Sequence, residues 1–179
     1  MNKATKILLL LFVIIPNSSG AQQTESAAVF EGQTTLLRPK SYREWVFVGS
    51  SLGLNYAQNP GQNQAEVFHN TYIDPVSYRE YTKTGKFREG TVMVLELFAA
   101  EVKKEPGLQG SYEKDFRALE VSLKDSRRFE GGWAYFGFSE GGKLKDKAEP
   151  FPASAGCLAC HTQKAETDHV FTQFYPVLR

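Results

Sequence analysis

A cysteine pair followed directly by a histidine, Cys157-Leu158-Ala159-Cys160-His161, constrains this chain more than any other feature of its sequence. Residues three positions apart lie about one turn apart on a helix, so the two thiols can face the same side. The histidine next to the second thiol brings an imidazole to that side as well. The fold must therefore present two thiols and one imidazole together near its C-terminal end.

This spacing is the attachment pattern of c-type haem. Each thiol can add to one vinyl group of the haem, and His161 can hold the iron through a neutral Nε2. We therefore predict one covalently bound haem c per chain, attached to Cys157 and Cys160, with His161 as the metal ligand.

Two other interpretations of the motif compete with haem. A disulfide of a thiol redox protein is one, but that motif usually opens a helix in a βαβ setting, and here the motif follows a loop late in the chain. A zinc site is the other, and it needs four ligands in a tetrahedral array. The chain offers only two cysteines and three histidines. We rank haem ahead of the disulfide, and the disulfide ahead of zinc.

The N-terminus has the three parts of a secretory signal peptide: Lys3 and Lys6, an apolar run at 7–15, and the small residues Ser19-Gly20-Ala21. We predict a signal peptide at 1–21, a flexible lead-in at 22–35 and one haem domain at 36–179. An uncleaved membrane anchor is the alternative, but the apolar run is too short to span a bilayer, and no later segment is apolar enough. Export to the periplasm is expected, and haem is attached to such motifs outside the cytoplasm.

The composition is compatible with one domain around a real core. The chain has 179 residues, of which 41% are hydrophobic and 13% aromatic. Its formal net charge is +1. No basic patch of the kind that binds nucleic acid is present, so we do not expect a nucleic-acid partner.

Alternation and turn residues predict strands at 66–73, 91–99, 118–123 and 132–138. Asp74 and Pro75 form a good helix start and Gly85 a stop, which predicts a helix over 75–84. Residues 42–48 suit either a helix end or a strand. The segments 50–64, 103–110 and 139–152 are predicted to be loops, and 129–132 a turn.

The function depends on what lies across the iron from His161. Once Met1 leaves with the signal peptide, Met93 is the only thioether candidate, and its apolar strand favours a core position. His169 follows the motif closely, on the expected proximal side. His69 lies in a predicted strand and can face either solvent or a pocket. An open distal site is therefore expected.

Several ordered stretches of the chain resemble the cytochrome P460 family. They are 42–49 (YREWVFVG), 72–78 (YIDPVSY), 84–92 (TGKFREGTV), 119–129 (LEVSLKDSRRF) and 157–179, which ends in FTQFYPVLR. The resemblance implies an α+β fold: a single domain built on a mainly antiparallel β-sheet with flanking short helices, with haem c bound near the C-terminal segment. It also implies a homodimer. Members of the P460 type oxidise hydroxylamine, and their relatives, the cytochromes c′-beta, bind nitric oxide or other small ligands.

The resemblance also assigns the distal residues. The lysine that is cross-linked to haem in the hydroxylamine-oxidising members falls at Leu95, so the cross-link should be absent. Glu120 matches a distal glutamate that relays protons, and His69 matches a family arginine approximately. Five aromatic residues could line the pocket, with alternation allowing only part of them to face inward: Phe68, Tyr72, Trp133, Tyr135 and Phe136.

These residues favour a cytochrome that binds a small ligand such as nitric oxide, because an apolar wall at Leu95 suits a diatomic molecule. The first alternative is a haem redox enzyme that oxidises hydroxylamine or uses peroxide, with Glu120 and His69 moving protons. The second is an electron-transfer cytochrome with Met93 as sixth ligand. A redox partner protein is a possible partner in each case.

Overall fold

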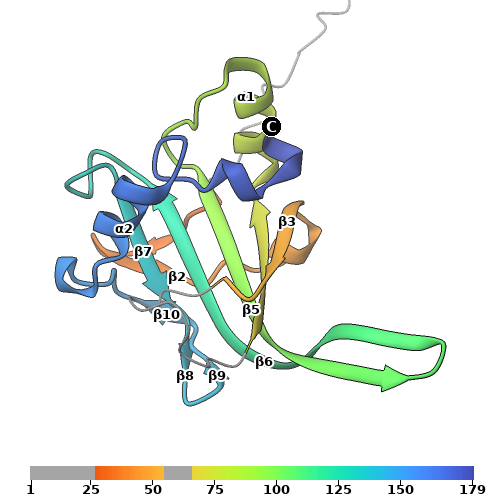
Figure 1. The fold of residues 1–179 in the computed structure, drawn as a ribbon. Helices are drawn as coiled ribbons and strands as arrows, with labels where there is room; N and C mark the ends of the chain where they lie inside the picture. Colours follow the sequence, from red (N-terminus) through yellow and green to blue (C-terminus); the bar gives the residue numbers. More distant parts are fainter. Residues whose placement is uncertain (1–26, 55–65) are drawn as a thin grey trace, which may run out of the picture.

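A five-stranded antiparallel sheet with the strand order β3-β4-β5-β6-β7 forms the frame of the protein (Figure 1). The strands are β3 (Val46–Leu52), β4 (Val67–Ile73), β5 (Val92–Glu105), β6 (Leu108–Lys124) and β7 (Trp133–Gly137). The computed structural model describes residues 27–54 and 66–179. The predicted signal peptide, residues 22–26 and most of the predicted 50–64 loop lie outside the described residues.

The helix α1 (Pro75–Thr84) has the bounds that its end residues predict. The Asp74 carboxylate accepts the Ser77 N–H at 2.8 Å, which caps the first turn. Gly85 ends the helix with a φ of 68°, a conformation that glycine adopts without strain. Asp74 also accepts the Val92 N–H at 3.0 Å, so the same carboxylate ties the start of α1 to the start of β5.

The segment 103–110 is not the loop that its Lys, Glu, Pro and Gly content predicted. It is the tip of a long hairpin, in which β5 and β6 continue to Glu105 and Leu108 and pair at their last residues. Only Pro106 and Gly107 form the turn, and Gly107 has a φ of 78°. The antiparallel partner supplies the backbone hydrogen bonds, so charged side chains are tolerated in strands whose faces are exposed. The hairpin projects from the sheet in Figure 1.

Regular structure also begins earlier than Leu36, contrary to the prediction of a flexible lead-in over 22–35. Strand β1 (Phe30–Glu31) pairs with β2 (Thr35–Leu37), which in turn pairs with β10 (Lys147–Ala148). The Phe30 ring packs on Phe129 with centroids 6.3 Å apart, which gives this short strand an apolar anchor.

The remaining elements are short. They are the 3₁₀ helices η1 (Tyr42–Glu44), η2 (Ala153–Ala155), η3 (Thr172–Phe174) and η4 (Pro176–Leu178), the strands β8 (Ser139–Glu140) and β9 (Lys143–Leu144), and the helix α2 (Cys157–Lys164). Residues 42–48 thus contain both a helical turn and a strand. The predicted 139–152 loop contains three short strands, and the predicted turn at 129–132 is confirmed by a 3.0 Å hydrogen bond from the Gly132 N–H to the Phe129 carbonyl.

The two faces of the sheet carry separate cores. One face contributes Val94, Val121 and Phe136 to the first hydrophobic cluster. The other contributes Ile73, Met93 and Trp133 to the second, which Val170 and Leu178 from the C-terminal segment complete. This segment packs with α2 on the second face. The structure thus confirms a single α+β domain with mainly antiparallel strands and short flanking helices.

None of the helices in the described parts of the chain combines the length and the hydropathy that a bilayer crossing requires.

Candidate functional site

The helix α2 begins at the first cysteine of the motif. Gly156 caps it in the left-handed conformation, with a φ of 75°, so that Cys157 is the first helical residue and Cys160 follows three positions later. Both cysteines are free thiols at intermediate exposure, so the disulfide alternative is not what the structure contains. Among the described residues, no group of three or more His, Cys, Asp or Glu side chains is arranged to hold a metal ion.

His161 is held by its neighbours in one orientation. Its Nδ1 lies 2.7 Å from the backbone carbonyl oxygen of His169. A carbonyl only accepts, so Nδ1 carries the proton and Nε2 keeps its lone pair for a metal. Burial lowers the pKa of His161, with the hydrogen bond to the His169 carbonyl acting in the opposite direction.

The imidazole ring of His161 contacts two aromatic rings. The centroids of Tyr135 and Phe171 are each 4.5 Å from that of His161. The Tyr135 hydroxyl is buried and has no hydrogen-bond partner among the described residues. Burial raises the pKa of Tyr135, so the phenol remains a neutral donor next to the motif.

Leu95 and Glu120 are direct cross-strand partners on the face of the sheet that α2 covers. A single row of paired residues crosses all five strands here: Gly49, Thr71, Leu95, Glu120 and Gly137. The register of Met93 opposite Ile73, and of Tyr135 opposite Ser122, places the neighbouring row on the same face. The predicted distal residues Leu95 and Glu120 are thus brought together.

Both ends of this row are glycines, and other segments lie directly on them. A Cβ at Gly49 would be 3.2 Å from the Phe174 carbonyl oxygen and 3.2 Å from Pro176 Cδ. A Cβ at Gly137 would be 2.5 Å from the Phe151 ring. The absent side chains therefore let the C-terminal segment and Phe151 approach the two edges of the sheet, on either side of Leu95 and Glu120.

Glu120 is partly buried, and this burial raises its pKa. Burial also raises the pKa of the Cys157 thiol, and the Glu120 charge adds to this effect. The two side chains are therefore within electrostatic reach of each other. A carboxyl group that holds its proton at higher pH than usual lies between the sheet and the cysteine motif.

His69 lies one row further along, opposite Leu97 and Ser51. Its side chain is 9% exposed, and its Nδ1 is buried without a hydrogen-bond partner in the described parts of the chain. Burial lowers the pKa of His69, and hydrogen bonding to the backbone of Val67 and Ser51 acts in the opposite direction. His69 therefore faces the same side as Leu95 rather than solvent.

Met93 belongs to the second hydrophobic cluster. It is 4% exposed and packs with Ile73, Phe87 and Trp133, as a core position predicts.

Of the five aromatic candidates for a pocket lining, only Trp133 and Tyr135 lie on the face of the sheet that carries Leu95 and Glu120. Phe68, Tyr72 and Phe136 lie on the opposite face because strand residues alternate.

The residues that hold the His161 surroundings were missed by sequence reasoning. They are Lys124, Asp168 and Phe171, together with the backbone of His169. The pair Asp168-His169 forms a tight turn with positive φ at both residues, 43° and 64°. Asn-Gly is the usual signal for such a turn, and an Asp-His pair is a weak one.

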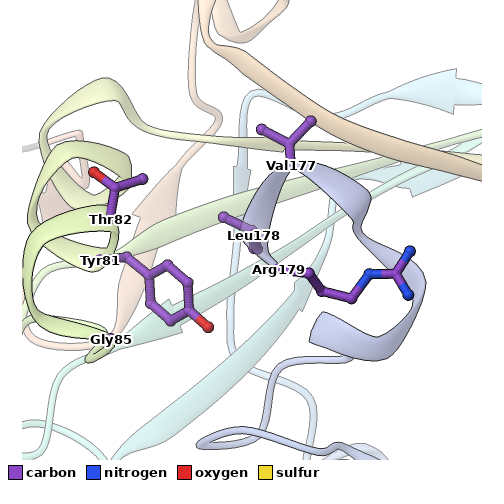
Figure 2. A pocket seen from close by; sticks show the side chains of 6 residues that line it. All are labelled: Tyr81, Thr82, Gly85, Val177, Leu178 and Arg179. Carbon is purple, nitrogen blue, oxygen red and sulfur yellow. The ribbon is translucent and has the colours of Figure 1, made fainter.

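A surface hollow of about 300 Å³ lies elsewhere, between the end of α1 and the C-terminus. Figure 2 shows its lining: Tyr81, Thr82, Gly85, Val177, Leu178 and Arg179. Leu178 is a member of the second hydrophobic cluster and Tyr81 packs against that cluster, so the floor of the hollow is packed core. None of the residues of the cysteine motif lines it.

Comparison with known proteins gives one family. A family model described as cytochrome P460 matches residues 39–172 of the chain. No curated protein matches the chain.

Proposed function

The chain belongs to the cytochrome P460 family, whose members are haem proteins, and we propose on that basis that it is an exported mono-haem c-type cytochrome that binds a small ligand such as nitric oxide. The observation that carries the proposal is the orientation of His161. Its Nδ1 donates to the His169 carbonyl at 2.7 Å, which leaves Nε2 as the free metal-binding atom beside two free thiols.

The donor set around α2 fits haem c. Cys157 and Cys160 would each form one carbon–sulfur bond with a vinyl group, as the thiol proton passes to the neighbouring vinyl carbon, so attachment needs no oxidant. His161, whose ring packs against Tyr135 and Phe171, would hold the iron through Nε2. When bound, the haem supplies an iron that takes up a sixth ligand and changes redox state.

Leu95 is the proposed wall of the ligand side. It occupies the centre of the row between Thr71 and Glu120. An apolar side chain offers no hydrogen bond to water or an anion, so it favours a neutral diatomic molecule. An alkyl side chain has no amine, and we therefore propose an ordinary c haem without the lysine cross-link of hydroxylamine-oxidising relatives. Met93 is engaged in the core, which supports an open sixth position.

Absorption spectra of the purified holoprotein in both redox states test this proposal. We expect a pyridine haemochrome typical of two thioether bonds, a five-coordinate high-spin ferrous state and a spectral change on titration with nitric oxide. The double variant Cys157→Ser/Cys160→Ser should lose covalent haem on a denaturing gel. A six-coordinate, low-spin ferrous spectrum that nitric oxide does not change would exclude the proposed ligand site.

A redox enzyme acting on hydroxylamine or peroxide is the second candidate. Glu120 favours it, because burial raises the pKa of a carboxyl that lies directly opposite Leu95. Such a group takes up and releases its proton at a higher pH than an ordinary carboxyl does, which suits it to proton transfer. We expect no hydroxylamine oxidation by the native protein. Turnover that falls at least tenfold in Glu120→Gln would establish this candidate instead.

An electron carrier with Met93 as sixth ligand is the third candidate. The variant Met93→Leu keeps the volume of the side chain and removes the sulfur. Unchanged spectra in this variant would exclude Met93 as a ligand.

We place the mature protein in the periplasm because haem is attached to such motifs outside the cytoplasm and the sequence begins with a predicted signal peptide. A homodimer and a redox partner protein are proposed from the family resemblance. Light scattering of the purified holoprotein would measure whether it is a dimer. Reduction of the holoprotein by a periplasmic extract would show whether a redox partner protein exists.

A further inference from the structure

The turn that supplies the His169 carbonyl is attached to the sheet by polar side chains. The Asp168 carboxylate accepts a hydrogen bond from Trp133 Nε1 at 3.2 Å. Its other oxygen lies 2.6 Å from Lys124 Nζ, which also donates to the Phe87 carbonyl at 3.0 Å. Lys124 in β6 and Trp133 in β7 are direct cross-strand partners. Both groups that hold Asp168 therefore come from the sheet.

The backbone of this turn needs such support. Thr167 and Val170 pair across it, with N–O distances of 3.3 and 2.8 Å. Asp168 and His169 between them have φ of 43° and 64°, in the left-handed region that residues with a side chain rarely adopt. Contacts outside the turn must therefore hold it in place, and Asp168 makes them.

We infer that the cluster Lys124–Asp168–Trp133 is a positioning device for His161. Asp168 fixes the turn, the turn fixes the His169 carbonyl, and the carbonyl orients the imidazole through Nδ1. This inference rests on the proposed role of His161 as iron ligand. None of the three side chains needs to touch the haem or its ligand, because each acts through His161.

The hydrogen bond at Nδ1 has a chemical consequence as well as a geometric one. An imidazole that donates Nδ1–H to a good acceptor is a stronger base at Nε2. A stronger donor strengthens the iron–histidine bond and favours the ferric state. Displacement of the turn should weaken this hydrogen bond, lower the iron–histidine stretching frequency and raise the reduction potential.

Charge alone predicts a different pattern from positioning. Asp168→Asn removes a negative charge and Lys124→Met removes a positive one, so a purely electrostatic effect on the iron would shift the potential in opposite directions. Positioning predicts that both variants raise it. Asn also tolerates a positive φ, so Asp168→Asn removes the ion pair without a backbone penalty.

The experiment compares these two variants and Trp133→Phe, which removes the indole N–H, in the holoprotein. Lys147→Met is the matched control, because Lys147 forms an ion pair of 2.8 Å with Glu31 at an exposed site. Potentiometric titration and resonance Raman spectroscopy of the ferrous protein are the readouts. We expect a raised potential and a lowered iron–histidine frequency in all three variants, and wild-type values in the control.

Wild-type potentials and frequencies in the haem-loaded variants would overturn the inference, even where the melting temperature falls, because a merely structural role predicts lower stability alone. Opposite shifts in Asp168→Asn and Lys124→Met would overturn it too. If one variant fails to fold by circular dichroism, the other two decide. Absence of attached haem in the wild type would contradict the proposed function instead, which keeps the two failures distinct.

Discussion

The Nδ1 atom of His161 donates its proton to the backbone carbonyl of His169 at 2.7 Å, so that the main chain of one histidine orients the side chain of the other. The two residues therefore have different roles, although both are histidines of one short segment. His161 offers Nε2, and His169 contributes a carbonyl that any residue has. The His169 ring instead lies 3.2 Å, through its Nδ1, from the Thr162 hydroxyl.

This difference predicts unequal effects of replacing the two histidines. His161→Ala should abolish haem attachment and the haem spectrum. His169→Asn should retain both, because Asn keeps the carbonyl and tolerates a φ of 64°, and its stability should change by less than about 0.5 kcal/mol. Haem staining and absorption spectra measure the outcome. Loss of haem in His169→Asn alone would show that the His169 ring is the ligand.

Asp74→Ala should destabilise the fold more than an ordinary surface substitution. Asp74 is 2% exposed and accepts two backbone N–H groups, from Ser77 in α1 and from Val92 in β5. Loss of a helix cap costs about 1 kcal/mol, and a buried N–H without a partner costs about 1–3 kcal/mol more. We expect a loss of about 2–4 kcal/mol in urea-induced unfolding of the holoprotein.

Asp146→Ala is the control for Asp74→Ala. Its carboxylate is exposed and forms one ion pair with Arg38 at 2.9 Å. Exposed pairs of this kind contribute about 0–1 kcal/mol. Equal losses in the two variants would contradict the double anchoring role of Asp74.

Local signals predicted those elements whose ends are determined by nearby residues. The bounds of α1 follow from Asp74 and Gly85, which act within one or two turns. The hairpin at 103–110 could not be predicted in the same way, because its strand conformation comes from pairing between β5 and β6. Charged residues at its tip resemble a loop in composition, and pairing is not visible in composition.

In the candidate site, too, features encoded by neighbouring residues could be predicted, whereas those that depend on long-range contacts could not. The attachment motif Cys157 to His161 is contiguous, so the sequence alone predicts the haem and its ligand. The partners of His161 come from β7, from the turn at 167–170 and from Phe171, and no spacing rule connects them. The register that places Leu95 opposite Glu120 likewise depends on the sheet as a whole.

Glu120 predicts an inverted dependence of stability on pH. Burial raises its pKa, so the folded chain binds this proton more tightly than the unfolded chain, where a glutamate has a pKa of about 4.3. Its contribution to the free energy of unfolding is therefore full below the pKa of the unfolded chain. It falls as the pH rises from that pKa to the raised pKa of the folded chain, and above the raised pKa the loss is complete. We expect Glu120→Gln to be more stable than the wild type at pH 7.5, with a difference that shrinks towards pH 4.

Denaturant titrations across this pH range measure the Glu120 contribution. Glu140→Gln, at an exposed position in β8, removes the same charge and controls for the change in net charge. A difference between Glu120→Gln and the wild type that grows on acidification would contradict the raised pKa.

Gly49→Ala should destabilise the contact between β3 and the C-terminal segment. A Cβ there would lie 3.2 Å from the Phe174 carbonyl oxygen and from Pro176 Cδ, and a backbone oxygen cannot rotate away. Overpacking of this kind costs about 1–3 kcal/mol, which lowers the melting temperature by several degrees in a chain of this size. Ser50→Ala, at the exposed neighbouring position, should melt with the wild type. Equal melting temperatures of the two variants would show that the C-terminal segment moves aside freely.

Leu95→Lys tests the apolar wall directly. The lysine would stand opposite Glu120 in the row across the sheet and bring a charged amine to the proposed ligand side. A polar group there should stabilise water or an anion on the ferric iron and weaken nitric oxide binding to the ferrous iron by about tenfold, equivalent to about 1.4 kcal/mol. Stopped-flow mixing of the reduced holoprotein with nitric oxide measures the affinity from the two rate constants.

Leu97→Lys is the matched control for Leu95→Lys. Leu97 lies on the same face of β5, two residues along, opposite His69 and Ala118, and is also partly buried. It receives the same charge outside the row that contains Leu95 and Glu120, so its nitric oxide affinity should stay within about twofold of the wild type. If the two lysine variants bind nitric oxide equally well at equal haem content, Leu95 does not form the ligand wall, and the small ligand must bind away from the row that Leu95 shares with Glu120.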